Sequence, residues 1–224
     1  SGRRAVGCGK PLMPTLPPGC ELIETMRVMP DGDIPLWPAH YKRLERSATA
    51  LGFPFDRPAL TEVKKKIVIE AKRTPQRCRL TLNRDGELIF TMLPLSSIPE
   101  PVSIRICESP IVRSPEMRFL DAFKVSIRDH YDRAFAERGT ADDVLLLNEA
   151  EEVTECTIYN IYIENKAGIF TPPLQCGLLP GIERTRLIEA GWATEQTLTI
   201  SDVTSASQLY VSNAVRGCLR ASLT

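Results

Sequence analysis

The sequence predicts an α+β protein built in two halves. Its 224 residues are 43% hydrophobic and 25% charged, the composition of a soluble protein that can bury a core. Strand and helix patterns follow one another without strict alternation, which favours an α+β fold over a doubly wound sheet. The segment 94–101 holds three prolines and two serines, which break both patterns. We therefore expect an N-terminal α/β domain over 1–95, a linker over 96–101 and a larger mixed α/β domain over 102–224.

The N-terminal domain is expected to begin with a hairpin and a helix. Residues 21–28 have the pattern of a strand, and a turn at 30–32 leads to a second short strand over 34–37. A helix over 39–51 follows, because apolar residues recur there at helical spacing until Gly52 ends it.

A second helix and a second hairpin complete this domain. The helix begins at Pro58, and its apolar residues recur at steps of three and four: Leu60, Val63, Ile67 and Ala71. Residues 78–82 alternate apolar and polar side chains, and a turn at 83–86 leads to a further strand over 88–93. The pattern indicates a sheet with one buried face.

The C-terminal domain is expected to mix strands and helices. Its predicted elements are a strand near Ile104, a helix over 129–137, strands over 144–147 and 160–163, a helix over 182–190 and a strand over 208–211.

Charge, cysteine and histidine counts exclude several classes of function. Because 28 basic residues balance 28 acidic ones, no positive surplus exists to neutralise nucleic-acid phosphates. No apolar stretch approaches the ~20 residues that cross a bilayer, and the first twenty residues lack the apolar segment of a secretory signal. Seven widely spread cysteines and two histidines support neither a disulfide framework nor a metal site. We expect a cytoplasmic protein without metal, membrane or nucleic-acid partners.

Lys124 is the first residue whose surroundings suggest chemistry. It stands between Phe123 and Val125. An amine in apolar surroundings loses solvation, which lowers its pKa and makes it a nucleophile at neutral pH. The same pattern also fits a lysine at the edge of a core, with its amine in water.

The loop over 177–181 is a second candidate, because it runs into the predicted helix over 182–190. A glycine-bearing loop that opens a helix presents unpaired N–H groups and the positive end of the helix dipole, which favour a phosphate or carboxylate. Such loops are common, so the loop taken alone fits a plain connection better than an anion site. Glu155 likewise fits either a site acid or a solvated strand end.

A spaced series of residues in the second half resembles the class IV aminotransferases that depend on pyridoxal phosphate, also called fold type IV. The matching positions are Glu155, Thr157, Asn160, Ile161, Tyr162, Ile169, Thr171, Leu179, Gly181, Ile182 and Arg184. The likeness extends from about residue 21 to the C-terminus. It implies a two-domain fold like that of D-amino-acid aminotransferase, with pyridoxal 5'-phosphate as the cofactor.

The resemblance implies roles for three residues. Lys124 resembles the lysine that holds the cofactor as a Schiff base. Glu155 would face the pyridine nitrogen, where a carboxylate keeps that nitrogen protonated. Arg43 resembles the arginine that binds the cofactor phosphate, a task suited to a rigid guanidinium.

Further contacts are implied with less definition. The backbone N–H groups of Ile182 and Glu183 would bind the same phosphate, although many relatives have a hydroxyl residue in place of Glu183. Ser212 and Asn213 resemble the last contact to the cofactor. Arg27 is a candidate for a substrate carboxylate, with an arginine at a strand edge as the alternative.

Three activities share this family resemblance: aminodeoxychorismate lyase, branched-chain aminotransferase and D-amino-acid aminotransferase. Three features resemble the lyase branch most: the sequence of residues 21–27, the spacing of Lys124, Arg128 and Tyr131, and the loop over 177–182. We therefore expect a homodimeric lyase that converts 4-amino-4-deoxychorismate, a small-molecule amine, to 4-aminobenzoate and pyruvate in folate biosynthesis. A degenerate, non-catalytic member would be expected to lack the lysine, glutamate or arginine named above, and all three are present.

Overall fold

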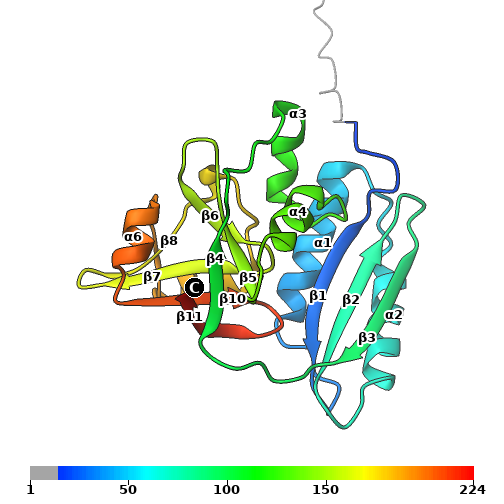
Figure 1. Cartoon of the computed structure of the whole chain (residues 1–224). Coiled ribbons are helices and arrows are strands. Elements are labelled where there is room, and N and C mark those ends of the chain that lie inside the picture. The colour runs from blue at the N-terminus through cyan, green and yellow to red at the C-terminus, as the bar shows by residue number, and fades with distance from the viewer. Residues whose placement is uncertain (1–14) are drawn as a thin grey trace, which may run out of the picture.

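Two β-sheets and their helices form the part of the chain that the computed structural model describes, residues 15–224 (Figure 1). Positions 1–14 of the expected N-terminal domain lie outside the described residues.

The smaller sheet has three antiparallel strands in the order β1-β2-β3: β1 (Leu22–Val28), β2 (Gln76–Leu82) and β3 (Leu88–Pro94). The side chains of β2 alternate between the two faces of this sheet: Cys78, Leu80 and Leu82 are buried on one face, and Arg77 and Arg79 are exposed on the other. These strands confirm the three predicted at 21–28, 78–82 and 88–93.

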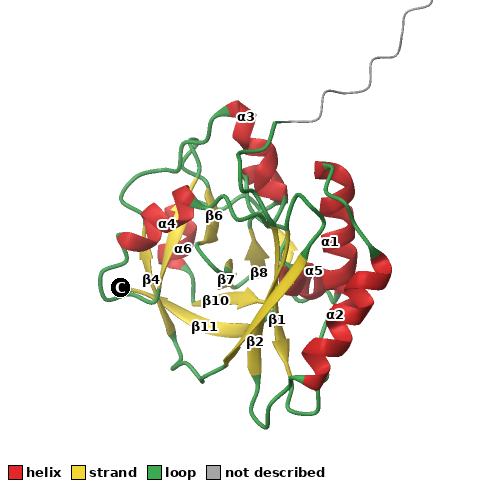
Figure 2. Cartoon of the chain, turned by 90° about the vertical axis from the view of Figure 1, so that its right-hand side faces the viewer, coloured by secondary structure: helices red, strands yellow, loops and turns green. Residues whose placement is uncertain are grey.

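Two helices cover one face of this sheet, α1 (Trp37–Leu51) and α2 (Arg57–Ile69) (Figure 2). Both carry a proline in the first turn, and α1 ends at Gly52, which adopts the left-handed conformation with φ 69°. The side chain of Asp56 caps α2 by accepting a hydrogen bond from the Ala59 N–H. Both predicted helices are confirmed, with α1 beginning two residues earlier.

The predicted strand over 34–37 is wrong. These residues form a turn into α1, with Leu36 at φ 64° and Trp37 already helical. One edge of β1 pairs with β2 along its whole length, and the start of the other edge meets the segment at Lys124 and Val125. Pro35 also lacks the N–H that a paired strand would donate. Ile34 is buried in the core below the sheet, which explains its apolar character.

The larger sheet has eight strands in the order β6-β5-β4-β11-β10-β7-β8-β9. They are β4 (Val102–Ile106), β5 (Asp143–Leu147), β6 (Val153–Cys156), β7 (Asn160–Asn165), β8 (Gly168–Thr171), β9 (Thr194–Glu195), β10 (Gln208–Asn213) and β11 (Gly217–Leu223). The strands predicted near 104 and at 144–147, 160–163 and 208–211 are confirmed as β4, β5, β7 and β10.

Short helices surround this sheet: α3 (Pro115–Arg118), α4 (Asp129–Ala136), α5 (Ile182–Glu189) and α6 (Ile200–Ser205), with single 3-10 turns at Phe119–Ala122 and Leu174–Cys176. The helices predicted over 129–137 and 182–190 are confirmed as α4 and α5. The mixed order of strands and helices confirms the predicted α+β class.

The two sheets are joined through the segment that follows the Phe119–Ala122 turn. The Ile23 N–H donates to the Lys124 carbonyl at 2.8 Å, and Leu22 forms an isolated bridge with Val125. Val125 and Leu120 pack into the core of the first sheet, although they lie beyond the predicted linker. The division of the chain at 96–101 therefore stays a prediction, while Lys124 is fixed where the sheets meet.

Three further observations concern the described residues. No helix within residues 15–224 is long and apolar enough to cross a membrane. No group of three or more potential metal ligands comes together there. The six cysteines in this range are free thiols.

Candidate functional site

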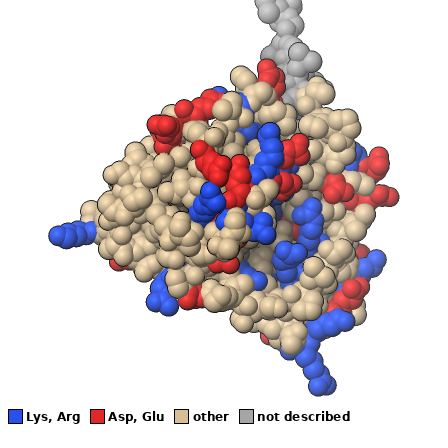
Figure 3. All heavy atoms as spheres, viewed as in Figure 1, with Lys and Arg blue, Asp and Glu red and all other residues tan. Residues whose placement is uncertain are grey.

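A cavity of about 450 Å³ lies between the two sheets. Its walls come from β1, α1 and β2 on one side, and from β6, β7, the start of α5 and the β10–β11 turn on the other. Figure 3 shows basic side chains gathered around a hollow in this region. The basic residues that line the cavity are Arg43, Arg77, Arg79, Lys124, Arg128 and Arg216, and the acidic ones are Asp142 and Glu155. The cavity is therefore suited to an anion.

Lys124 enters this cavity from the strand-like segment that pairs with β1. Burial and, to a smaller extent, the positive charges of Arg43 and Arg128 lower the pKa of its amine to about 7, against the opposing effect of Glu24 and Glu155. A large fraction of the amine is thus neutral at physiological pH. This is the property that a nucleophile or a base requires.

Glu155 lies at the end of β6 and is held by three hydrogen bonds. The Tyr131 hydroxyl donates to Oε1 at 2.5 Å, and the Leu179 N–H donates to the same oxygen at 3.0 Å. The Asn160 amide donates to Oε2 at 3.2 Å and also to the Leu179 carbonyl. Burial raises the pKa of Glu155 to about 7, although the hydrogen bonds from Tyr131 and Leu179 favour its ionised form.

The buried carboxylate of Glu24 holds the Arg43 guanidinium in place. Its Nε and Nη2 donate to the two oxygens of Glu24 at 2.8 and 2.6 Å, and His40 Nδ1 lies 2.6 Å from the same carboxylate. Burial alone would raise the pKa of Glu24, but Arg43 and His40 outweigh it and lower the pKa to about 2. The two hydrogen bonds to Glu24 occupy the Nε–Nη2 edge of the guanidinium, which leaves Nη1 for the cavity that Arg43 lines.

The N-terminus of α5 reaches the same cavity through Gly181 and Ile182. No side chain caps this helix, so the first-turn N–H groups, including those of Ile182 and Glu183, have no partner within the helix. The φ of Gly181 is −61°, so its need for glycine is spatial: a Cβ there would lie 2.0 Å from Asn160 Oδ1. The Glu183 carboxylate pairs with Arg186 at 2.6 Å, and Glu183 is not among the residues that line the cavity, although its backbone N–H belongs to the first turn of α5.

Ser212 and Asn213, at the end of β10, line the cavity as well. The Ser212 hydroxyl is fully buried at 2.7 Å from the Tyr162 hydroxyl. Asn213 Oδ1 accepts the N–H groups of Val215 and Arg216, which shapes the turn into β11. Six of the eight site residues chosen from the sequence thus line the cavity, and Glu183 follows them in the first turn of α5 without lining it.

Arg27 does not line the cavity either, and its Nε is buried without a hydrogen-bond partner. Arg77, its partner across the β1–β2 ladder, and Arg79 line the cavity instead. These two arginines had no role among the residues predicted from the sequence. Their exposed i, i+2 positions on an alternating strand were the available signal.

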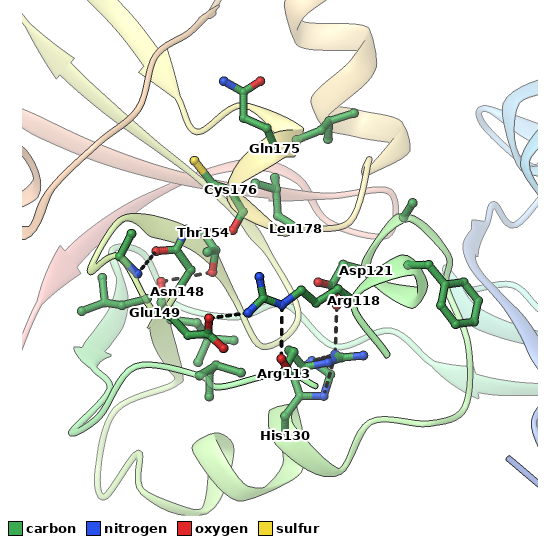
Figure 4. Close-up of a pocket in the computed structure, with 18 of the residues that line it drawn as sticks. Arg113, Arg118, Asp121, His130, Asn148, Glu149, Thr154, Gln175, Cys176 and Leu178 are labelled. Carbon is green, nitrogen blue, oxygen red and sulfur yellow. Dashed lines mark hydrogen bonds and ion pairs between the residues drawn. The ribbon is translucent and has the colours of Figure 1, made fainter. Parts of the chain in front are cut away.

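A second cavity, of about 420 Å³, lies near α3 and α4. Figure 4 shows the ion pairs that cross it, Arg113 with Asp121 at 3.0 Å and Arg118 with Glu149. Its charged side chains are paired with one another, and neither Lys124 nor Glu155 lines it. The predicted residues therefore select the cavity between the sheets as the candidate active site.

Known proteins that resemble this chain identify the family to which it belongs. The model of the amino-transferase class IV family matches residues 21–223. The chain belongs to that family. Its members are enzymes that depend on pyridoxal phosphate, so the predicted cofactor and the prediction of a pyridoxal phosphate-dependent enzyme are confirmed.

Individual relatives resemble the chain to different degrees in sequence and in structure. A protein of Schizosaccharomyces pombe named "Putative aminodeoxychorismate lyase" is 30% identical over 166 residues, which cover 72% of this chain and 71% of that protein. A structure from Mesorhizobium loti, described as a "Putative amino-acid aminotransferase", is 35% identical with a TM-score of 0.84 and covers 92% of this chain and all of that one. An aminotransferase from Brucella abortus, bound to pyridoxal phosphate, shares the fold at 18% identity and a TM-score of 0.76, over 91% of this chain and 80% of that one.

Proposed function

We propose that this class IV enzyme is an aminodeoxychorismate lyase, which converts 4-amino-4-deoxychorismate to 4-aminobenzoate and pyruvate for folate biosynthesis. The observation that carries the proposal is the composition of the cavity wall, where Lys124 and Glu155 are accompanied by five arginines. The printed name of the Schizosaccharomyces pombe relative supports the same activity.

The residues in the cavity fit pyridoxal phosphate. Arg43 and the uncapped N–H groups of Ile182 and Glu183 would bind the phosphate, because a guanidinium edge and a helix N-terminus both favour anions. Ser212 and Asn213 would close this end of the site. Fixed by three donors, Glu155 would face the pyridine nitrogen, and the amine of Lys124 would hold the aldehyde carbon.

When bound, the cofactor supplies an electron sink for the pair left behind as the substrate loses a proton. Lys124 would hold the cofactor between turnovers, and its free Nζ would remove the proton from the amine-bearing ring carbon of the substrate. A pKa of about 7 keeps a large fraction of this base neutral. Nζ next returns the proton to the departing enolpyruvyl group. The ring C–O bond breaks, the ring becomes aromatic, and pyruvate leaves without added water or oxidant.

The arginines fit the charge of this substrate. After one guanidinium is assigned to the phosphate, the wall still carries Arg77, Arg79, Arg128 and Arg216. 4-Amino-4-deoxychorismate carries two carboxylates, whereas a branched-chain amino acid carries one carboxylate and an apolar side chain. A wall this cationic favours the dicarboxylate.

An aminotransferase remains the second candidate, and the printed description of the Mesorhizobium loti structure is the observation in its favour. In that reaction the same lysine returns the proton to the cofactor, and the product is a keto acid. We further propose that the active form is a cytoplasmic homodimer.

A product assay tests the proposal. The purified protein, supplied with pyridoxal phosphate, is given 4-amino-4-deoxychorismate, or L- and D-amino acids with 2-oxoglutarate. We expect equal amounts of 4-aminobenzoate and pyruvate from the first substrate only. Lys124→Ala should lower this rate at least ~100-fold, the usual contribution of a general base. Lys65→Ala, on the exposed face of α2, is the matched control and should leave it unchanged. Keto-acid formation without 4-aminobenzoate would establish the aminotransferase instead.

A further inference from the structure

Tyr131 on α4 has no role in the chemistry described above, yet it makes the shortest contact to Glu155. Its hydroxyl donates to Glu155 Oε1 at 2.5 Å. The residue lines both the cavity between the sheets and the second cavity, so its side chain forms part of the wall that separates them. The Arg128 guanidinium lies 4.5 Å from the centre of its ring, and the His130 ring packs against it at 4.0 Å. The phenol is thus held in one position.

We propose that Tyr131 is a positioning residue that fixes Glu155 and favours the ionised form of its carboxylate near neutral pH. The inference rests on the proposed function, because it matters for the reaction only if Glu155 faces the pyridine nitrogen. A phenol that donates a hydrogen bond stabilises a carboxylate and not a carboxylic acid. An ionised Glu155 is what keeps the pyridine nitrogen protonated.

The other donors to Glu155 cannot replace Tyr131. The Leu179 N–H shares Oε1 at 3.0 Å, and the Asn160 amide reaches only Oε2, at 3.2 Å. The cations that face Glu155 are Lys124, whose own pKa is lowered to about 7, and Arg128. Because burial raises the pKa of Glu155 to about 7, the carboxylate is balanced near neutrality, and the loss of one strong donor would favour its acid form.

The phenol itself does not titrate in this range. Burial, with the nearby charge of Glu155 and Asp121, raises the pKa of Tyr131 well above its usual value. The adjacent His130 does not titrate there either, because burial and the Arg113 charge lower its pKa to about 3. Lys124 also has a pKa of about 7, but in the holoenzyme its amine would hold the cofactor, so the carboxyl signal of Glu155 itself is the readout that reports on Glu155.

The test is a direct titration of Glu155 in Tyr131→Phe, a substitution that removes only the hydroxyl. The holoenzyme is labelled with carboxyl-¹³C glutamate, and the Glu155 resonance is assigned by its loss in Glu155→Gln. We expect the Glu155 pKa to rise by at least about one unit in Tyr131→Phe. In protein loaded with ¹⁵N-labelled cofactor, the ring nitrogen should be less protonated at neutral pH in Tyr131→Phe than in the wild type, because the proton would lie on the more basic Glu155.

Tyr210→Phe is the matched control, because Tyr210 donates a similar hydrogen bond to Glu164 at 2.7 Å outside the cavity. It should leave the Glu155 pKa and the ring nitrogen unchanged. An unchanged Glu155 pKa in a folded Tyr131→Phe would overturn the inference, as would an equal shift in the control. Neither readout requires turnover. A shift without lyase products would therefore refute the proposed function alone, and products without a shift would refute the role of Tyr131 alone.

Discussion

At the scale of single residues, the site depends on charges that are buried in pairs. Glu24 is only 2% exposed and faces the 7% exposed Arg43, which it holds through two nitrogens. An arginine in this position would be costly to bury without a partner. Glu24 therefore determines both the stability of this region and the direction in which Arg43 presents its remaining nitrogen.

Glu24→Gln should destabilise the protein by about 3 kcal/mol, the usual cost of leaving a buried ion unpaired. Because the Glu24 pKa falls from 4.5 in the unfolded chain to about 2, its contribution is present above pH ~5 and is lost as the pH falls toward 2. Urea unfolding between pH 3 and pH 7 should thus show a smaller pH dependence in Glu24→Gln than in the wild type. Glu62→Gln, an exposed glutamate paired with Lys65, should differ little from the wild type. Equal pH dependence in wild type and Glu24→Gln would contradict the assignment.

At the scale of elements, α5 is oriented by one close approach. Gly181 brings the start of the helix against Asn160, which in turn donates to Glu155. The helix N-terminus and the carboxylate are thus set at a fixed separation. Only a residue without a Cβ allows it.

Gly181→Ala should weaken cofactor binding at least ~10-fold, because the new methyl group would lie 2.0 Å from Asn160 Oδ1 and the helix start must move. Titration of the apoprotein with pyridoxal phosphate, followed by fluorescence, measures the loss. Adding Asn160→Gly to this variant removes the clash and should recover part of the affinity. If Gly181→Ala binds as tightly as the wild type, the close approach does not set the phosphate site.

The elements that sequence analysis found are those with clear local patterns. Strand β2 alternates over seven residues, and α1 and α2 begin at prolines, so local chemistry identifies them. Strands β6, β8, β9 and β11 were missed. The first three are only two to four residues long, and β11, although seven residues long, shows no regular alternation of buried and exposed side chains and pairs with β10 and the distant β4. The false strand over 34–37 arose similarly: a turn beside β1 predicted a hairpin, while long-range pairing with β2 took its place.

At the scale of the whole molecule, the active site exists only where the two sheets meet. Arg43 comes from α1, Lys124 from the connecting segment and Glu155 from β6. No periodicity links positions so far apart in the chain, so their proximity followed from the family resemblance and not from local patterns. Arg77, Arg79 and Tyr131 were left without roles for the same reason.

The connection over 96–101 is held in place by residues from the C-terminal end of the chain. Arg216 donates to the Ser96 carbonyl, and the Arg220 N–H donates to Glu100 at 2.8 Å. These contacts hold the segment against the β10–β11 turn, where Ile98 and Pro99 line the cavity. The segment predicted as a linker thus forms a wall of the site.

The proposed homodimer predicts a particle of twice the 25.0 kDa of one chain. Light scattering coupled to size-exclusion chromatography measures this mass directly. Closed two-fold assembly predicts a mass that stays constant over a hundredfold range of protein concentration. A monomer at every concentration, in protein loaded with cofactor, would contradict it.

The central claim is that Lys124, in the cavity between the sheets, carries the cofactor. Borohydride reduction of protein loaded with pyridoxal phosphate, followed by peptide mass spectrometry, tests it most directly. We predict a single pyridoxyl adduct on the peptide that contains Lys124, and its loss in Lys124→Ala. An adduct on another lysine, or no adduct with the cofactor in excess, would contradict the assignment of this cavity as the active site.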